Sequence, residues 1–262
     1  MIIFYQGNIY SKNQTLINPE SPGFQFGYGF FTTMKFEEEK VFFLQKHLKR
    51  LENSLDQFGL TLPNLDYLNI IKSMIRESCL EKGRVKIIVY MNHDDMSDAV
   101  IFLKENGTEL ESCRLLLSEE KRGDSILWKH KSLSYLSLFL GKKEAVLQGA
   151  DDFLYKDYRD NLLETSIANI FFIQGKNIYT PPKSLPILPG IIREEILEKK
   201  EIDGFHIFEK EIKVSEISFF DGVFLTNSIV PVLPVLSING IQFSCEVSNK
   251  IKNQILQEFL CP

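Results

Sequence analysis

The feature that most constrains the fold is a change in the spacing of apolar residues, which switches between strand-like and helix-like in long blocks. Residues 30–43 contain two apolar stretches around a charged turn, a pattern typical of a β-hairpin. Between residues 48 and 58, apolar side chains recur every three or four positions, which predicts a helix that ends at Gly59. Blocks of this kind, rather than strict alternation of strand and helix, predict an α+β fold.

The rest of the chain continues the pattern and predicts two domains. A polar stretch at 104–111, containing Asn106-Gly107, reads as a linker. We therefore expect an N-terminal α+β domain (1–105), a linker (106–111) and a C-terminal domain (112–262). The further elements that we expect are helices at 65–79, 133–147, 191–199 and 248–259, and strands at 2–5, 85–90, 99–103, 114–117, 162–163, 170–173, 223–226, 235–238 and 241–243.

The composition excludes several classes of protein. The 262 residues include 30 Lys and Arg against 35 Asp and Glu, a net charge of −5, whereas nucleic-acid-binding proteins present a basic surface. No apolar stretch approaches the roughly 18 residues of a membrane-spanning helix. The cysteines Cys79, Cys113, Cys245 and Cys261 are scattered, so we expect neither a zinc site nor a disulfide framework. Their sparse use favours a reducing compartment, the cytoplasm.

Lys131 is the first candidate catalytic residue. It follows Trp128, Lys129 and His130, at the expected entry to the helix 133–147. A lysine amine attacks a carbonyl once it has lost its proton, and neighbouring cations and aromatic rings favour that loss. A solvated basic loop is the alternative explanation of the same residues.

Glu164 and two flanking segments are further candidates. Glu164 lies among apolar and small residues before the strand 170–173, where a partly buried carboxylate needs a partner, although a carboxylate in a turn would look the same. Residues 188–195 place Pro-Gly before a helix, whose first N–H groups attract an anion. Residues 225–228 end a strand with small polar side chains. Many such segments bind nothing, so each signal is weak by itself.

Taken together and in this order, seven segments resemble the fold-type IV pyridoxal-phosphate enzymes, the class IV aminotransferase-like family. The resemblance covers nearly the whole chain. It implies a two-domain fold like that of D-amino-acid aminotransferase, with pyridoxal 5′-phosphate between the domains, and a homodimer. The matching segments are Phe26–Thr33, His47–Leu51, Lys131–Leu136 followed by 143–145 and 149–151, Glu164–Phe172, Tyr179–Pro182, Leu188–Arg193 and Phe224–Ser228.

The resemblance also implies a role for each matching residue. Lys131 falls on the lysine that binds the cofactor covalently and later moves the substrate proton, and Glu164 on the carboxylate that pairs with the pyridine nitrogen. Arg50 falls on the arginine that binds the phosphate. Tyr135 matches a tyrosine that contacts the ring hydroxyl in some members. Four more positions fall on the phosphate cradle: Ile191, Ile192, Asn227 and Ser228.

The segment Phe31-Thr32-Thr33 is most similar to the 4-amino-4-deoxychorismate lyases of the family, in which the second threonine assists catalysis. Transaminases more often carry Glu-Gly or Glu-Val there. Strand alternation places Phe31, Thr33 and Lys35 on one face, although threonine is also a common strand residue. The resemblance thus implies a lyase that takes a small-molecule amine and releases pyruvate and p-aminobenzoate for folate synthesis.

Two alternatives remain open at this point. One is an aminotransferase acting on branched-chain or D-amino acids with the same Lys131 and Glu164. The other is a non-catalytic relative, which the presence of Lys131, Glu164 and Arg50 argues against. Two departures leave the substrate undetermined: residues 91–96 stand where many relatives carry an Arg-Gly-x-Gly loop, and Tyr28 stands where Asp is usual.

Overall fold

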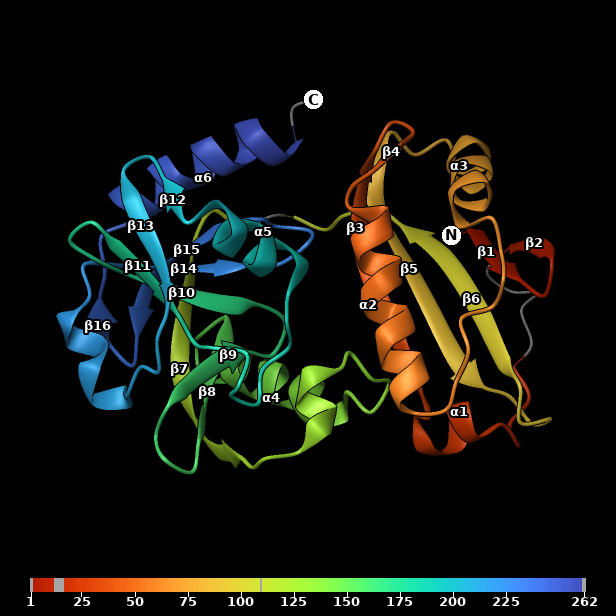
Figure 1. The fold of residues 1–262 in the computed structure, drawn as a ribbon, viewed down its shortest axis with the longest axis horizontal. Helices are drawn as coiled ribbons and strands as arrows, with labels where there is room; N and C mark the ends of the chain where they lie inside the picture. Colours follow the sequence, from red (N-terminus) through yellow and green to blue (C-terminus); the bar gives the residue numbers. More distant parts are fainter. Residues whose placement is uncertain (1, 12–16, 109, 261–262) are drawn as a thin grey trace. The chain divides into compact units, whose positions relative to one another are not determined.

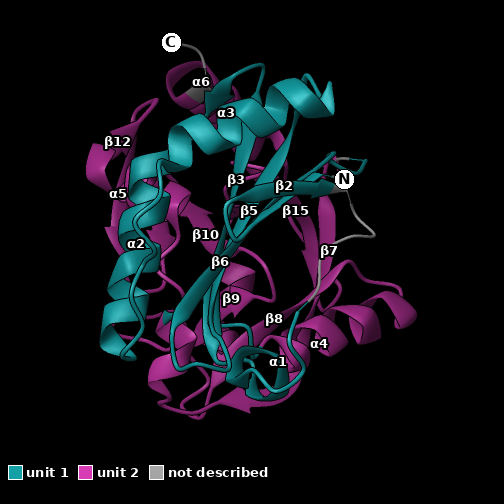
Figure 2. Ribbon diagram, turned by 90° about the vertical axis from the view of Figure 1, so that its right-hand side faces the viewer, with its two compact units in different colours: residues 1–108, 130–134 teal, residues 109–129, 135–262 magenta. Residues whose placement is uncertain are grey.

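The computed structural model describes residues 2–11, 17–108 and 110–260, so Glu109 of the expected linker and Cys261 lie outside the described residues. The chain divides into two compact units (Figure 2). The first contains residues 1–108 and 130–134, and the second contains residues 109–129 and 135–262. In the described part of the chain, no helix combines the length and the apolar character that crossing a membrane requires.

The first unit is built on one antiparallel sheet with the strand order β2-β1-β6-β5-β3-β4. Burial alternates along most of the inner strand at residues 82–91, as expected where the two faces of a strand have different surroundings. The elements are β1 (Ile2–Tyr5), β2 (Asn8–Ser11), α1 (Pro22–Phe26), β3 (Gly29–Glu37), β4 (Lys40–Val41), α2 (Leu44–Gln57), α3 (Tyr67–Ser78), β5 (Lys82–Met91) and β6 (Ser97–Lys104).

The two faces of this sheet have different surroundings. Helices α2 and α3 pack on one face, where Met34 and Phe36 of β3 and Leu51 and Leu55 of α2 belong to one buried cluster (Figure 1). A smaller cluster with Tyr5, Tyr90 and Val100 lies on the opposite face. Because side chains alternate along β3 and its Phe30 and Met34 belong to the helix-side cluster, Thr32 shares the helix-covered face, and its neighbours Phe31 and Thr33 share the other.

The second unit is a larger mixed sheet with short helices around it. Its elements are β7 (Cys113–Arg122), the 3₁₀ helix η1 (Ile126–Lys129), α4 (Leu136–Leu147), β8 (Asp152–Asp157), β9 (Leu162–Thr165), β10 (Asn169–Gln174), β11 (Asn177–Thr180), α5 (Ile191–Lys199), β12 (Glu201–Ile202), β13 (Phe205–Glu209), the 3₁₀ helix η2 (Val214–Phe219), β14 (Gly222–Thr226), β15 (Leu233–Ile238), β16 (Ile241–Gln242) and α6 (Glu246–Leu260).

Six strands of the second unit close into a ring. The path β10-β14-β15-β7-β8-β9 returns to β10 because Glu164 of β9 pairs with Asn169 of β10. Strand β7 runs parallel to both β8 and β15, while the other pairs in the ring are antiparallel. The candidate residue Glu164 therefore lies at the pairing that closes the sheet.

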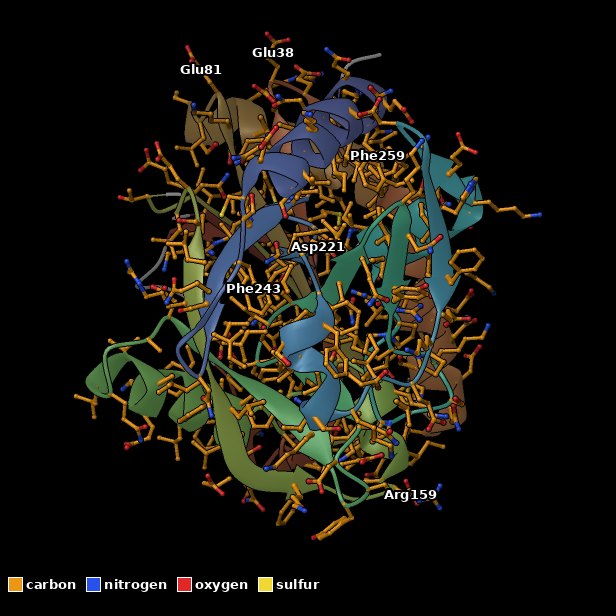
Figure 3. The ribbon with its side chains drawn as sticks, turned by 90° about the vertical axis from the view of Figure 1, so that its left-hand side faces the viewer. Glu38, Glu81, Arg159, Asp221, Phe243 and Phe259 are labelled. Atoms are coloured by element: carbon orange, nitrogen blue, oxygen red, sulfur yellow. The ribbon has the colours of Figure 1, made fainter. Side chains whose placement is uncertain are left out.

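A hydrogen bond fixes the start of β14, and apolar packing fixes the helix that follows the sheet. Asp221, labelled in Figure 3, accepts a hydrogen bond from the Gly175 N–H at 2.7 Å, which joins the start of β14 to the turn after β10. Phe243, labelled in the same view, is buried in the main cluster of the unit. Helix α6 follows it and buries Ile251 and Ile255 completely.

The structure corrects several boundaries expected from the sequence; the strand expected at 114–117, for example, continues to Arg122 in β7. The hairpin expected over residues 30–43 ends at Val41, because Phe43 adopts a left-handed conformation (φ 56°) as the N-cap of α2. The helix 133–147 begins only at Leu136, since residues before it pair with β3. Periodicity also missed α1, β8, β11 and β13, which are short or lack clear alternation.

Candidate active site

Lys131 is placed by a short strand-like pairing with the start of β3. The Phe31 N–H donates to the Lys131 carbonyl at 2.8 Å, and the Leu133 N–H donates to the Gly29 carbonyl at 2.8 Å. The Lys131 Nζ atom lies 4.8 Å from the centre of the Phe31 ring, within the range of a cation–π contact. The amine is thus held against the sheet face that carries Phe31 and Thr33.

Lys86 is a candidate that the sequence analysis missed. It stands directly opposite Thr33 in the pairing of β3 with β5, and its Nζ atom lies 3.9 Å from the centre of the same Phe31 ring. Burial lowers the pKa of Lys86, and the charge of Arg84 lowers it further. A lysine inside an apolar strand was the available signal. Its position makes it suited to binding a carboxylate near Thr33.

Arg50 is attached to the helix-covered face of the same sheet. Its Nη2 atom donates to the Thr32 hydroxyl at 3.1 Å, and that hydroxyl lies 2.6 Å from Nδ1 of His47. His47 is fully buried. Burial, with the charges of Arg50 and Lys131, holds the pKa of His47 well below its ordinary value. The imidazole is therefore neutral at physiological pH.

The cations that precede Lys131 have different surroundings. His130 Nδ1 lies 2.9 Å from the Ser54 hydroxyl, and its ring meets the Phe58 ring edge-on at 5.1 Å. Lys129 is exposed at the end of η1. A solvated basic loop therefore describes Lys129 but not His130.

Glu164 is buried and is held by several donors of the second unit. Its Oε1 atom accepts from Arg122 Nη1 at 2.8 Å, and its Oε2 atom accepts from Asn169 Nδ2 at 2.9 Å. The Leu188 N–H lies 3.2 Å from both oxygens. These donors supply the partners that a buried carboxylate requires, and Glu164 lies in a strand rather than in a turn.

Arg122 is a second residue that sequence reasoning missed. Its side chain is 1% exposed, and its guanidinium lies between two rings, 4.4 Å from the centre of Trp128 and 4.5 Å from that of Tyr155. Buried ion pairs are costly to break, because the remaining charge loses its partner. Loss of either Arg122 or Glu164 would therefore leave a buried charge without this partner.

Asn169 connects Glu164 to the start of α5. Besides Glu164, its Nδ2 atom donates to the Leu188 carbonyl at 2.8 Å. A side chain at Gly190 would place its Cβ atom 2.0 Å from Asn169 Oδ1, so any other residue there would displace the Asn169 side chain. Helix α5 begins at the next residue, and the backbone N–H groups of Ile191 and Ile192 belong to its first turn, which lacks acceptors within the helix.

Thr226 is the last residue of β14 and pairs directly with Asn169 of β10, so the two side chains lie on the same face of the sheet. The Thr226 hydroxyl is buried and has no hydrogen-bond partner among the described residues. Asn227 Oδ1 accepts from the N–H groups of Ile229 and Val230 at 2.9 and 2.8 Å, which closes the turn that contains Ser228. A helix start and an unpartnered hydroxyl on one unit are features suited to an anion with several acceptor oxygens.

Tyr135 lies at the N-cap of α4. Its hydroxyl donates to the Ser166 carbonyl, and the Ser166 hydroxyl lies 2.7 Å from both oxygens of Asp152. Burial raises the pKa of Tyr135. The phenol therefore stays protonated, with its proton directed at Ser166 and its oxygen able to accept a further hydrogen bond.

The two departures noted in the sequence have local structural roles. The Tyr28 hydroxyl donates to the Phe58 carbonyl at 2.5 Å, just after α2. In the turn between β5 and β6, Asn92 Oδ1 accepts from the N–H groups of Asp94 and Met96 at 2.9 and 3.0 Å. Tyr28 thus fixes the end of a helix, and Asn92 closes a hairpin.

Comparison of the chain with known proteins finds a family that it matches. The profile of the amino-transferase class IV family matches residues 29–238. Aminodeoxychorismate lyase of Bacillus subtilis (strain 168) is 22% identical over 261 residues, covering 94% of this chain and 89% of its own length.

Solved structures show the same fold. A branched-chain aminotransferase from Thermoproteus uzoniensis, with norvaline, superposes with a TM-score of 0.92 at 21% identity, covering 99% of this chain and 95% of that chain. The T.th. branched-chain amino acid aminotransferase, with pyridoxamine 5′-phosphate, gives a TM-score of 0.89 at 21% identity, covering 98% and 93%. The expected α+β, fold-type IV architecture is therefore confirmed.

Proposed function

The chain belongs to the amino-transferase class IV family, and on this premise we propose that it is a pyridoxal-5′-phosphate-dependent 4-amino-4-deoxychorismate lyase. The reaction releases p-aminobenzoate and pyruvate. The observation that carries the proposal is the position of Thr33, whose hydroxyl belongs to the sheet face against which the amines of Lys131 and Lys86 lie. A hydroxyl on the same face as two amines could pass a proton, while an ammonium there could bind an acidic substrate.

The residues of the chain fit pyridoxal 5′-phosphate, the cofactor of this family. The start of α5 and the unpartnered Thr226 hydroxyl suit a phosphate group, and the charged, buried Glu164 suits a protonated pyridine nitrogen. Lys131 would bind the cofactor covalently and Tyr135 would contact its ring hydroxyl. The phosphate would be held by Arg50, Ile191, Ile192, Asn227 and Ser228.

The bound cofactor supplies an electron sink for negative charge on the substrate carbon next to the amine. Displaced by the substrate amine, the Lys131 amine would remove the proton from the substrate ring carbon that carries this amine. Glu164 would hold a proton on the pyridine nitrogen by charge pairing. The enol of pyruvate would leave from the adjacent carbon of the substrate ring as that ring becomes aromatic. Thr33 delivers a proton to the departing group, directly or through water.

Lys86 contributes to substrate binding in this proposal. Both 4-amino-4-deoxychorismate and its pyruvate fragment carry carboxylates, and the Lys86 ammonium lies on the same sheet face as Thr33, directly across the strand pair. A charge-assisted hydrogen bond from this ammonium would hold a carboxylate beside the proton relay. The hairpin at 91–96 supplies no arginine for that task.

The test of the function is a product assay. Purified protein with pyridoxal 5′-phosphate is incubated with 4-amino-4-deoxychorismate, and p-aminobenzoate and pyruvate are quantified. A panel of branched-chain and D-amino acids with a keto-acid acceptor is run beside it. Release of both products without consumption of an amino donor supports the lyase. Transfer of an amino group without p-aminobenzoate identifies the aminotransferase alternative.

Glu164→Gln is expected to bind the cofactor but to lose turnover by on the order of 10²-fold, because the neutral amide no longer holds the pyridine proton by charge pairing. Turnover and cofactor absorbance are measured on the same preparation. Asp157→Asn is the control, since Asp157 is another buried carboxylate of the second unit and is bonded to Asn161 instead. Near-normal turnover in Glu164→Gln would contradict the role of Glu164.

A homodimer is part of the proposal. Helix α4 supports it, because several apolar side chains of this helix are exposed on the single chain, at 51–82%: Leu136, Phe139, Leu140, Val146 and Leu147. Apolar clusters of this kind often mark interfaces. Sedimentation at micromolar concentration is expected to give about twice the 30.3 kDa chain mass. Leu140→Glu should shift it toward the monomer, whereas Lys143→Glu, also on α4, should not. A fully active wild-type monomer would refute the assembly.

A further inference from the structure

We infer that Thr32 and His47 form a buried support that positions the Arg50 guanidinium for the phosphate of the cofactor. The inference rests on the proposed function, which assigns Arg50 to that phosphate. It concerns the face of β3 opposite to Thr33, and neither Thr32 nor His47 would touch the cofactor. Both are positioning residues that act through Arg50.

The geometry joins one strand to one helix through a single hydroxyl. His47 and Arg50 are three residues apart on α2, so they share a face of that helix. Thr32 lies on the sheet face that α2 covers, and it is fully buried. Its Oγ1 atom lies 2.6 Å from His47 Nδ1 and 3.1 Å from Arg50 Nη2.

The direction of these hydrogen bonds follows from the chemistry of the groups. A guanidinium can only donate, so the Thr32 oxygen accepts from Arg50. The neutral His47 ring can then accept the Thr32 proton or donate to the second lone pair of the oxygen. Either arrangement fixes the hydroxyl, because rotation of Thr32 would break a bond to a buried group.

Such a support matters because an arginine side chain loses much rotational freedom when it binds an anion. Ordering a long side chain costs conformational entropy, and a guanidinium that is already held in place has less freedom to lose. Thr32 and the neutral His47 carry no charge. They therefore orient the guanidinium without weakening its attraction for a phosphate dianion.

The remaining polar atom of His47 is consistent with this role. Its Nε2 atom is buried and has no hydrogen-bond partner among the described residues. An apolar side chain would fill such a place at lower cost, since an unpaired buried polar atom is destabilising. The hydrogen bond between Nδ1 and the Thr32 hydroxyl is a reason for a histidine at this position despite that cost.

The test compares two ligands that differ only in the phosphate. Dissociation constants of pyridoxal 5′-phosphate and of pyridoxal are measured on the cofactor-free protein by absorbance. Thr32→Val removes the hydroxyl and keeps the branched shape. It is expected to raise the dissociation constant of pyridoxal 5′-phosphate about tenfold, the effect of one hydrogen bond to a charged group. The dissociation constant of pyridoxal should not change. Thr32→Ser keeps the hydroxyl and should retain the wild-type affinity for both ligands.

Further variants test the link itself. The double variant Thr32→Val with Arg50→Gln should bind pyridoxal 5′-phosphate no more weakly than Arg50→Gln alone, because Thr32 acts through Arg50. His47→Leu leaves Thr32 in place and should also weaken only the phosphorylated ligand. Ser248→Ala, which removes a buried hydroxyl of α6 in the other unit, is the control and should change neither constant.

The outcomes distinguish the assignment of Arg50 to the phosphate from its support by Thr32 and His47. If Arg50→Gln weakens both ligands equally, the assignment of Arg50 to the phosphate in the proposed function is wrong. If Arg50→Gln is selective but Thr32→Val and His47→Leu leave both constants unchanged, the support is wrong and the assignment of Arg50 stands. Equal losses for both ligands in Thr32→Val, with a lower melting temperature, would indicate a general packing defect and would also overturn the inference.

Discussion

Lys131→Ala is expected to lose turnover by on the order of 10⁴-fold or more, because it removes the covalent attachment of the cofactor and the base that moves the substrate proton. The Lys131 carbonyl accepts a hydrogen bond from the Phe31 N–H of β3, and alanine preserves this backbone pairing, so the variant should fold. Release of p-aminobenzoate and the melting temperature are the two measurements. A large loss of turnover with an unchanged melting temperature is the expected result.

The attachment itself is tested by trapping it. Wild-type protein with bound cofactor should absorb near the edge of the visible range, and reduction with borohydride should fix the cofactor on Lys131, as mapped by peptide mass spectrometry. Lys129→Ala is the matched control, since Lys129 is exposed two residues earlier, and it should keep its activity. An adduct on Lys129, Lys142 or Lys143 would show that the assignment of Lys131 is wrong.

Local signals predicted much of the fold. Helix α5 occupies the expected range 191–199. Its two caps are the residues next to it in the chain: Gly190 precedes the first turn, and Lys200 ends the helix in a left-handed conformation. Helices α2 and α3 were also visible, since their apolar residues recur with the helical period. Where the signal is contained in neighbouring residues, one sequence is enough to locate the element.

Contacts between distant residues could not be predicted in this way. Arg122 is 42 residues before Glu164, and nothing near Glu164 indicates that a guanidinium lies 2.8 Å from its carboxylate. Lys86 is brought opposite Thr33 only by the register of β3 and β5. The entry to α4 was misplaced for the same reason, since residues 131–133 pair with a strand a hundred residues earlier.

The two adjacent threonines of β3 illustrate how the pleat divides the work of the site. Thr32 faces α2, where it contacts His47 and Arg50, and Thr33 faces the opposite side, where Phe31 contacts the amine of Lys131. Because the strand period is two, two neighbouring hydroxyls reach different surroundings. We therefore expect their valine variants to fail in different ways, one in cofactor affinity and the other in turnover.

Thr33→Val is expected to bind the cofactor normally and to release p-aminobenzoate about 10²–10⁴-fold more slowly, the usual contribution of a positioned proton donor. Valine keeps the β-branched shape at this half-buried position and removes only the hydroxyl, with a small effect on stability. The measurements are the single-turnover rate of p-aminobenzoate release and the dissociation constant of the cofactor. Thr33→Ser, which keeps the hydroxyl, is the matched control.

The same variant separates the lyase from the aminotransferase. In transamination, Lys131 can carry the proton between the two carbons by itself, so the Thr33 hydroxyl has no comparable task. An aminotransferase should therefore tolerate Thr33→Val, and a lyase should not. Unchanged release of p-aminobenzoate in Thr33→Val would refute the proton relay. Wild-type protein that transaminates an amino acid and makes no p-aminobenzoate would refute the lyase itself, and Lys131 and Glu164 would then serve an aminotransferase.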